Sequence, residues 1–141
     1  MPVERDRLIE EARTWIDTPY VHQGRLRGIG CDCIGLLIGV ATPLGLTAFE
    51  AKAYGRLPNG NRMRRLADEN LTRIPRADIQ PGDVLLMAWR RAPQHLALVT
   101  QLQGRLGMLH ADGRVGRVVE HTLSDDWRER IVGTYAIPGV I

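Results

Sequence analysis

Two cysteines, Cys31 and Cys33, lie one residue apart and are the only thiols of the chain. A disulfide between them would close a very tight, strained ring, so a structural cross-link is not expected. Two thiols are also too few ligands for a zinc site unless histidines join them at suitable spacing. At least one of the two cysteines is therefore expected to be present for its reactivity.

The residues around Cys33 favour a nucleophile at the start of a helix. Apolar residues recur at helical spacing from Cys33 to Val40, and Asp32 is a good N-cap for such a helix. The unpaired N–H groups and the positive end of the helix dipole favour a thiolate at Cys33. The carboxylate of Asp32 opposes a second anion unless it is occupied in capping. An inert, buried cysteine is the alternative interpretation of this segment.

A thiol nucleophile needs a general base, and the base needs a partner that orients it. The candidates are His22, His95, His110 and His121. His22 follows Tyr20 in a loop and could line a cleft, although an incidental polar residue is the simpler interpretation. His121 ends a strand-like segment and is expected to be exposed.

His95 and His110 fall on consecutive strand-like segments joined by a turn at Gln103-Gly104. If those two residues are the whole hairpin loop, paired positions sum to 207. The two histidines then lie on one face of the sheet, one diagonal step apart. A longer loop would change this register, and a single strand histidine is more often a satisfied core residue. A pair on one face favours a general base and its orienting partner.

The elements that must position these residues change character along the chain. Helical periodicity is seen first, and short apolar segments separated by turns follow. This order predicts an α+β fold in which helices pack on an antiparallel sheet of five or six strands. The chain is expected to be one domain over residues 1–141. Helices are predicted at 4–17, 33–42 and 61–73, and strands at 84–87, 95–101, 106–111, 117–121 and 131–137.

Composition excludes several classes of protein. A hydrophobic fraction of 44% and a charged fraction of 25% are typical of a globular domain. The net charge of +3 suits an anionic polymer but is far below a nucleic-acid footprint. No apolar run is long enough to span a membrane, and the N-terminus lacks the apolar core of a signal peptide. No carboxylate pair suits glycoside chemistry, and no phosphate-binding glycine loop follows a strand.

The sequence also resembles a known family. The segments 18–20, 28–36, 80–84, 95–99 and 109–111 are similar, in order, to the signatures of NlpC-family cell-wall peptidases, which have a papain-like fold. The resemblance covers roughly residues 8–120. It is strongest to the short single-domain members encoded among tail genes of bacteriophages and gene transfer agents, several of which carry a similar GxGCDCxGL stretch.

The resemblance implies a role for each matching residue. Cys33 is the nucleophile, His95 the general base and His110 the polar residue that orients His95. Tyr20 matches a tyrosine whose hydroxyl helps the backbone N–H of Cys33 to hold the oxyanion. No metal or organic cofactor is implied, and Cys31 has no assigned role.

Substrate contacts are expected from Asp32, Ile34, His22 and Trp89. Trp89 lies shortly before His95 and is expected either in the core or as a wall of the cleft. Many family members have serine where this chain has Ile34, in a stretch that helps to hold a free substrate N-terminus. The replacement predicts a cut within attached stem peptides rather than recognition of a terminal amine.

Together these observations predict a peptidoglycan hydrolase that cleaves an amide of the stem peptide. It is expected to be made in a bacterial cytoplasm, to be carried by a virion or tail-like particle with hub or tip proteins as partners, and to act in the periplasm or cell wall. Neither nucleic-acid binding nor membrane insertion is expected. Two alternatives stay open: an idle structural or wall-binding tail subunit, and a related amidase or acyltransferase.

Overall fold

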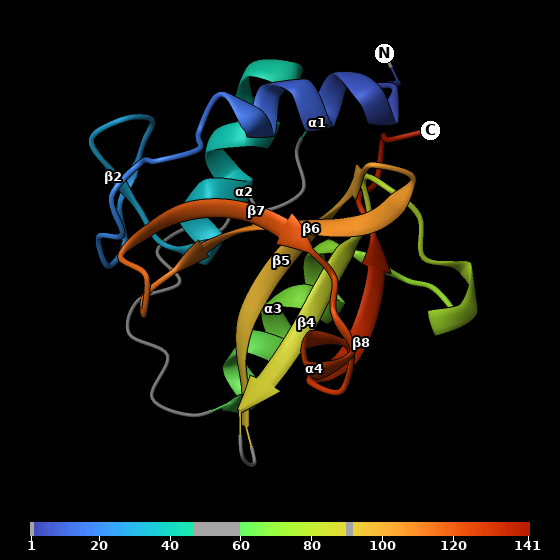
Figure 1. Ribbon diagram of the computed structural model, residues 1–141. Helices are drawn as coiled ribbons and strands as arrows, with labels where there is room; N and C mark the ends of the chain where they lie inside the picture. Colours follow the sequence, from blue (N-terminus) through green and yellow to red (C-terminus); the bar gives the residue numbers. More distant parts are fainter. Residues whose placement is uncertain (1, 47–59, 90–91) are drawn as a thin grey trace.

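The protein folds into helices and one main sheet, as the computed structural model describes for residues 2–46, 60–89 and 92–141 (Figure 1). The elements in chain order are α1 (Arg5–Arg13), β1 (Arg25–Leu26), β2 (Gly30–Cys31), α2 (Cys33–Ala41), α3 (Gly60–Asn70), β3 (Thr72–Arg73), β4 (Val84–Trp89), β5 (Ala92–Leu102), β6 (Arg105–Asp112), β7 (Arg117–Thr122), α4 (Asp125–Arg128) and β8 (Ile131–Ala136). Short 3-10 turns occupy Thr42–Leu44 and Arg76–Asp78. The predicted α+β class is confirmed.

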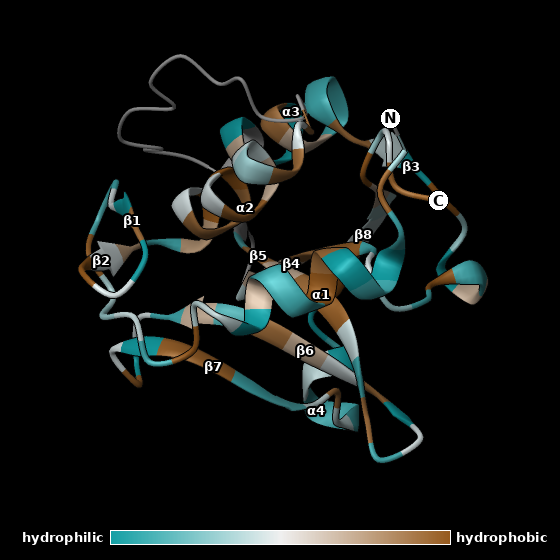
Figure 2. Cartoon of the chain, turned by 90° about the horizontal axis from the view of Figure 1, so that it is seen from above, coloured by the Kyte–Doolittle hydropathy of each residue, from teal (hydrophilic) through white to brown (hydrophobic). Residues whose placement is uncertain are grey.

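The main sheet has six antiparallel strands in the order β3-β8-β4-β5-β6-β7, and β1 and β2 form a separate small hairpin. Both faces of the sheet are apolar, and each packs against different elements. One face carries residues such as Leu86, Leu98 and Leu109, which join the core formed with α1, α2 and α3. The opposite face carries residues such as Met87 and Met108, which pack with Trp127 of α4. Figure 2 shows the helices lying over the sheet with their hydrophobic residues in brown.

The hairpin between β5 and β6 has the register that the sequence predicts. Leu98 pairs with Leu109, and Leu102 pairs with Arg105, so paired positions sum to 207. Gln103 and Gly104 both have positive φ, 50° and 79°. Positive φ at both central residues defines the two-residue turn whose twist matches that of the strands. The turn therefore decides which residues of β6 share a face with those of β5.

Helix α2 begins where the sequence places it. Asp32 is the N-cap, and its Oδ1 accepts a hydrogen bond of 2.7 Å from the backbone N–H of Gly35. Eight of its nine residues, Gly39 being the exception, are buried, so this helix is a central element of the core rather than an amphipathic surface helix. A β-carbon on Gly35 would lie 1.8 Å from the carbonyl oxygen of Gly24. Only glycine at this position lets the loop before β1 cross the first turn of α2 so closely.

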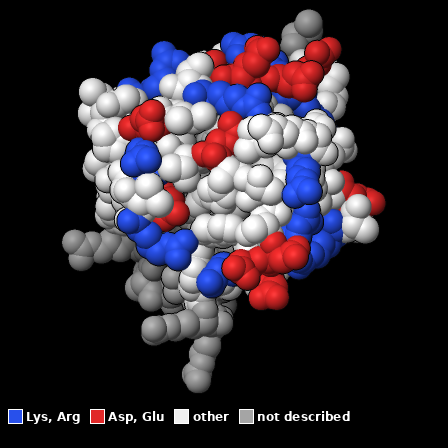
Figure 3. Space-filling model, in the orientation of Figure 1, with Lys and Arg blue, Asp and Glu red and all other residues white. Residues whose placement is uncertain are grey.

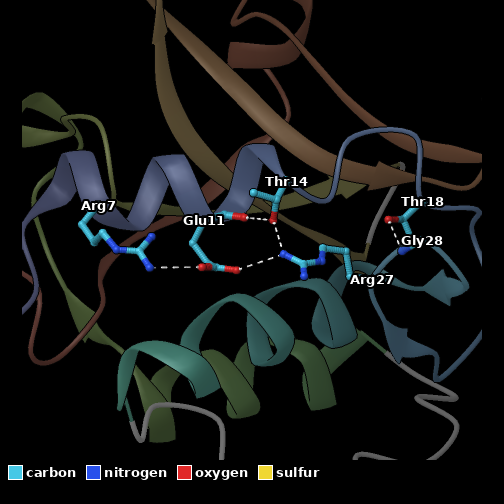
Figure 4. A network of polar contacts seen from close by, with 6 residues as sticks. All are labelled: Arg7, Glu11, Thr14, Thr18, Arg27 and Gly28. Atoms are coloured by element: carbon cyan, nitrogen blue, oxygen red, sulfur yellow. Dashed lines mark hydrogen bonds and ion pairs between the residues drawn. The ribbon is translucent and has the colours of Figure 1, made fainter.

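Polar contacts tie the segment before α2 to α1 (Figure 4). The guanidinium of Arg27 donates to Thr14 Oγ1 at 3.0 Å and lies 3.6 Å from the carboxylate of Glu11. The backbone N–H of Gly28 donates to Thr18 Oγ1 at 2.9 Å. Each exposed contact is worth about 1 kcal/mol or less. Together they hold the β1–β2 hairpin in one place relative to α1.

Charged side chains of both signs are interspersed on the face shown in Figure 3. This mixed surface differs from the single-sign patch that a nucleic-acid-binding protein presents. Across the described ranges, no helix is both long enough and apolar enough to cross a bilayer.

Candidate active site

Cys33 occupies the first position of α2 and is 7% exposed. Its sulfur lies within hydrogen-bonding reach of the backbone of Leu96, the residue that follows His95 on β5. The backbone of Ile34, the second residue of α2, also contributes a hydrogen bond to the sulfur. The thiol of the helix therefore meets the strand that carries the first candidate base.

The sulfur meets this strand at a place where the sheet ladder is open. The N–H of Val99 donates to Asp83 O at 2.8 Å, on the β4 side of β5. Since successive N–H groups of a strand point to alternate sides, the N–H of Leu96 points towards β6. The paired register of β5 and β6 begins only at Leu98 and Leu109, although both strands extend beyond it. The N–H of Leu96 is thus available to the Cys33 sulfur.

Three histidines form a hydrogen-bonded row across neighbouring strands. His95 Nε2 lies 2.7 Å from His110 Nδ1, and His110 Nε2 lies 2.8 Å from His121 Nε2. His121 Nδ1 in turn lies 2.9 Å from the carbonyl oxygen of Thr122. We call these three residues the histidine row. The contact between His95 and His110 is the diagonal neighbour relation that the two-residue hairpin predicts.

Burial keeps the inner histidines neutral. Burial lowers the pKa of His95 to about 4, an effect that Asp112 opposes and Arg114 reinforces. Burial also lowers the pKa of His110 to about 2, and the possible positive charges of His95, His121 and Arg114 lower it further. A neutral imidazole has a lone pair on one ring nitrogen, so His95 can accept a proton.

Burial raises the pKa of the Cys33 thiol to about 12, and the carboxylate of Asp32 raises it further. Hydrogen bonds from the backbones of Leu96 and Ile34 act in the opposite direction and lower this pKa. The sequence predicts that the helix terminus favours a thiolate, but desolvation outweighs that effect in the structure. Cys33 and His95 are therefore a neutral thiol and a neutral imidazole when no ligand is bound.

Tyr20 pairs with Cys31 through an isolated β-bridge, two residues before Cys33. Burial raises the pKa of its hydroxyl to about 12, and negative charge on Cys33, Asp32 and Cys31 would raise it further. Its ring lies over Gly113, where a β-carbon would come 3.6 Å from the ring. The phenol stays protonated at physiological pH and can donate a hydrogen bond near Cys33.

A cavity of about 250 Å³ opens at the histidine row and is lined by Trp89, His95, Asp112, Gly113, Arg114 and Trp127. Trp89 packs edge-on against His95, with ring centroids 5.4 Å apart. Its buried indole N–H has no hydrogen-bond partner among the described residues. Trp89 therefore walls a cleft beside the candidate base, in the position that the sequence suggests.

The other residues expected to contact substrate differ in how exposed they are. Asp32 is 5% exposed, and its two oxygens accept from the backbone N–H groups of Gly35 and Gln23. His22 is largely exposed and lies 4.0 Å from Asp32. Ile34 is 2% exposed within the main core, which weighs against the substrate contact expected of it. Cys31 is a fully buried free thiol in the same core.

Sequence reasoning missed three contributors to the site. His121 was expected to be exposed, but it is half-buried because it joins the histidine row. Trp127 packs on His110 and His121, with centroids 5.1 and 5.3 Å apart. Arg114 lies over the rings of Trp89 and Trp127. The register of β6 with β7 would have placed His121 diagonally from His110, but the loop between those strands does not fix a register in sequence.

Comparison with known families decides where the chain belongs. The model of the NlpC/P60 family matches residues 17–135, which include Tyr20, Cys33 and the whole histidine row. The chain belongs to the NlpC/P60 family. No match to a curated protein sequence was found.

Solved structures of NlpC/P60 proteins share the fold. An NlpC/P60 family protein from Bacillus cereus ATCC 10987 superposes with a TM-score of 0.70 at 21% identity, covering 95% of this chain and 40% of that protein. The NlpC/P60 domain of the peptidoglycan hydrolase SagA gives 0.66 at 19% identity, covering 96% of this chain and all of that domain. An N-acetylmuramoyl-L-alanine amidase from Bacteroides uniformis ATCC 8492 gives 0.63 at 13% identity, with 93% and 96% coverage. At these identities the likeness concerns the fold.

Proposed function

We propose that this NlpC/P60 protein hydrolyses an amide bond in the stem peptide of peptidoglycan, with Cys33 as nucleophile and His95 as general base. The observation that carries the proposal is the buried 2.7 Å contact between His95 Nε2 and His110 Nδ1. The residue after His95, Leu96, is the one whose backbone contributes a hydrogen bond to the Cys33 sulfur. A nucleophile, a base and an orienting group in this order are the requirements of covalent acyl transfer.

The reaction begins from the neutral pair. His95 Nδ1 takes the proton of the Cys33 thiol as the sulfur bonds to the peptide carbonyl carbon, and the carbonyl electron pair moves onto oxygen. Collapse of this intermediate expels the amine, which takes its proton from His95. Water, deprotonated by His95, then releases the acyl group and restores the thiol.

Two donors stabilise the oxyanion in this mechanism. The backbone N–H of Cys33 lies at the N-terminus of α2, where N–H groups have no partner within the helix. The Tyr20 hydroxyl, whose pKa is raised to about 12, is protonated and is proposed as the second donor. Loss of one such donor costs about 100- to 1000-fold in kcat.

The test is digestion of purified sacculi, with soluble products identified by mass spectrometry. Wild type should release peptide fragments, and Cys33→Ala should release none while its thermal midpoint stays close to that of wild type. Cys31→Ala is the matched control, since it removes the other thiol and should retain release. Absence of release by wild type, where a known wall hydrolase is active on the same sacculi, would contradict the proposal and favour an idle wall-binding subunit.

The products also identify the bond. Fragments that begin within the peptide indicate an endopeptidase, whereas whole stem peptides with a free L-alanine amine indicate an amidase. The amidase alternative is supported by the fold shared with the Bacteroides uniformis enzyme. Free stem peptides should be cut no better than attached ones if the replacement at Ile34 excludes a terminal amine. Strict dependence on a free N-terminal L-alanine would contradict that expectation and leave the peptidase assignment intact.

We further propose that the protein serves a tail-like particle that opens the wall locally during genome delivery. The GxGCDCxGL-type stretch at residues 28–36, similar to that of short tail-encoded members of the family, supports this setting. Mass spectrometry of purified particles from the producing strain should detect the chain together with tail hub or tip proteins. Its absence from particles, with the protein found in the cell envelope, would contradict the particle role.

A further inference from the structure

His121 has no role in the mechanism above, although its ring contacts that of His110. The proposed chemistry uses Cys33, His95 and His110, yet the row continues to a third ring at 2.8 Å. The far side of that ring contacts a backbone carbonyl, Thr122 O, at 2.9 Å. A carbonyl oxygen can only accept a hydrogen bond, so this end of the row has a fixed direction.

This donor-to-acceptor direction determines the hydrogen bond at each ring in turn. His121 Nδ1 must carry the proton that it donates to Thr122 O, so in the neutral ring Nε2 is the acceptor. His110 Nε2 must then donate to His121 Nε2, which leaves His110 Nδ1 as an acceptor. His95 Nε2 must donate to His110 Nδ1, which leaves the lone pair of His95 on Nδ1. When all three imidazoles are neutral, one carbonyl thereby determines their tautomers.

Without His121 the row would lose this direction. A buried His110 bonded only to His95 could either donate or accept through Nδ1, and its Nε2 would have no partner. The two arrangements place the His95 lone pair on different nitrogens, and the proposed proton transfer uses only Nδ1. Trp127 holds the rings of both His110 and His121 from one side, with centroids 5.1 and 5.3 Å away, which restricts their rotation.

We infer that His121 is a positioning residue for the Cys33–His95 pair: anchored on the Thr122 carbonyl, it sets through His110 the tautomer in which His95 Nδ1 is free to accept the thiol proton. This inference rests on the proposed function for its catalytic consequence, but the tautomers themselves do not depend on any substrate.

Ring-nitrogen NMR of the ¹⁵N-histidine-labelled full chain at pH 7 tests the tautomers directly. Wild type should show Nε2–H in His95, Nε2–H in His110 and Nδ1–H in His121. In His121→Phe, which keeps a flat ring beside Trp127, His95 should become a mixture of both tautomers. In His121→Gln the amide oxygen can again accept from His110 Nε2, so the wild-type tautomer of His95 should be restored.

Kinetics on the wall substrate provide the second measurement. His121→Phe should lower kcat roughly 10-fold or more with little change in KM, since a misplaced general base loses part of a typical 100- to 10,000-fold contribution. His121→Gln should recover most of this loss. Arg105→Gln, an exposed change at the other end of β6, should match wild type.

The two proposals fail separately. An Nδ1–H tautomer of His95 in wild type would overturn the positioning role, whatever the activity. So would an unchanged His95 tautomer and unchanged kcat in His121→Phe with a wild-type fold. If the tautomers are as stated but no substrate is cut by wild type, the geometry of the row stands and the hydrolase proposal falls.

Discussion

The backbone of Leu96 lies within hydrogen-bonding reach of the Cys33 sulfur, so the candidate nucleophile at the start of α2 meets the strand residue next to the candidate base, His95. This contact exists because the β5–β6 ladder opens beyond Leu98 and frees a backbone donor. The relative position of Cys33 and His95 is therefore set by main-chain geometry as well as by side-chain packing.

Thiol reactivity should be slow near neutral pH and should increase with pH. The pKa values of Cys33 and Cys31 are both raised to about 12 by burial, so the thiolate fraction grows about tenfold per pH unit below that value. Iodoacetamide should modify Cys33 before Cys31, because Cys31 is fully buried and Cys33 is 7% exposed. Mass spectrometry of peptides after timed labelling between pH 6 and 9 measures both rates. Rapid labelling of Cys33 at pH 6 would instead show a preformed thiolate–imidazolium pair.

Acid should destabilise the fold through its inner histidines. The pKa of His95 is lowered to about 4 from an ordinary 6.5, so below pH 6.5 the unfolded chain binds protons that the native chain does not. Stability is therefore complete above pH 6.5 and is lost as pH falls towards 4. Each such histidine contributes a slope of up to about 1.4 kcal/mol per pH unit. Urea unfolding at pH 7, 6 and 5 measures this slope.

His110 has a pKa lowered in the same direction, to about 2, so it should contribute over the same acid range. His110→Asn removes one of these titrating groups and retains a polar side chain. Its unfolding free energy should change less between pH 7 and 5 than that of wild type. Parallel pH dependences in the two proteins would contradict the assignment of the slope to His110.

Gly35→Ala should damage both the fold and the site. The new β-carbon would lie 1.8 Å from Gly24 O and 3.1 Å from Asp32 Oδ1, against a backbone atom that cannot move aside cheaply. We expect a loss of roughly 2–3 kcal/mol and a displaced first turn of α2. Gly113→Ala is the control for stability, since its β-carbon would meet nothing closer than 3.6 Å. Equal thermal midpoints of the two variants would contradict this account.

Arg5 should matter more to stability than Arg7 of the same helix. Its guanidinium donates to Asp83 Oδ1 at 2.8 Å and to Pro81 O at 2.9 Å, and the Asp83 side chain is only 1% exposed. Arg5→Met leaves a buried carboxylate without its cation, at a cost of about 2–4 kcal/mol. Arg7→Met breaks an exposed pair with Glu11 and should cost less than about 1 kcal/mol. Denaturant midpoints of the two variants compare them, and a similar loss in both would exclude a special role for the Asp83 pair.

Much of this arrangement is predictable from sequence because its signals are local. Asp32 before an apolar helical period marks the start of α2, and the Gln103-Gly104 turn fixes the register of β5 and β6. Those two features suffice to place His95 and His110 on one face. The short apolar segments between turns also predict five of the six strands of the main sheet, with ends that differ by a few residues.

The remaining features depend on tertiary contacts that leave little trace in the sequence. Strand β3 and the β1–β2 hairpin have only two residues per strand, too few for any alternation to be seen, and α4 is a single turn. The environment of Cys33 was expected to favour a thiolate, because the helix terminus is visible in sequence and burial is not. His121 was overlooked because its partner, His110, is reached across a loop of undefined length.

The two-residue turn at Gln103-Gly104 makes loop length a determinant of chemistry. Surface hairpins usually tolerate insertions, since lengthening a loop costs little free energy. Here one added residue that shifted the pairing of β6 by one position would turn His110 to the helix-covered face and remove it from both of its neighbours. Relatives that use such a histidine row should therefore vary the residues of this turn but keep a loop length that leaves His110 on the same face. The length of a solvent-exposed loop is thus tied to activity.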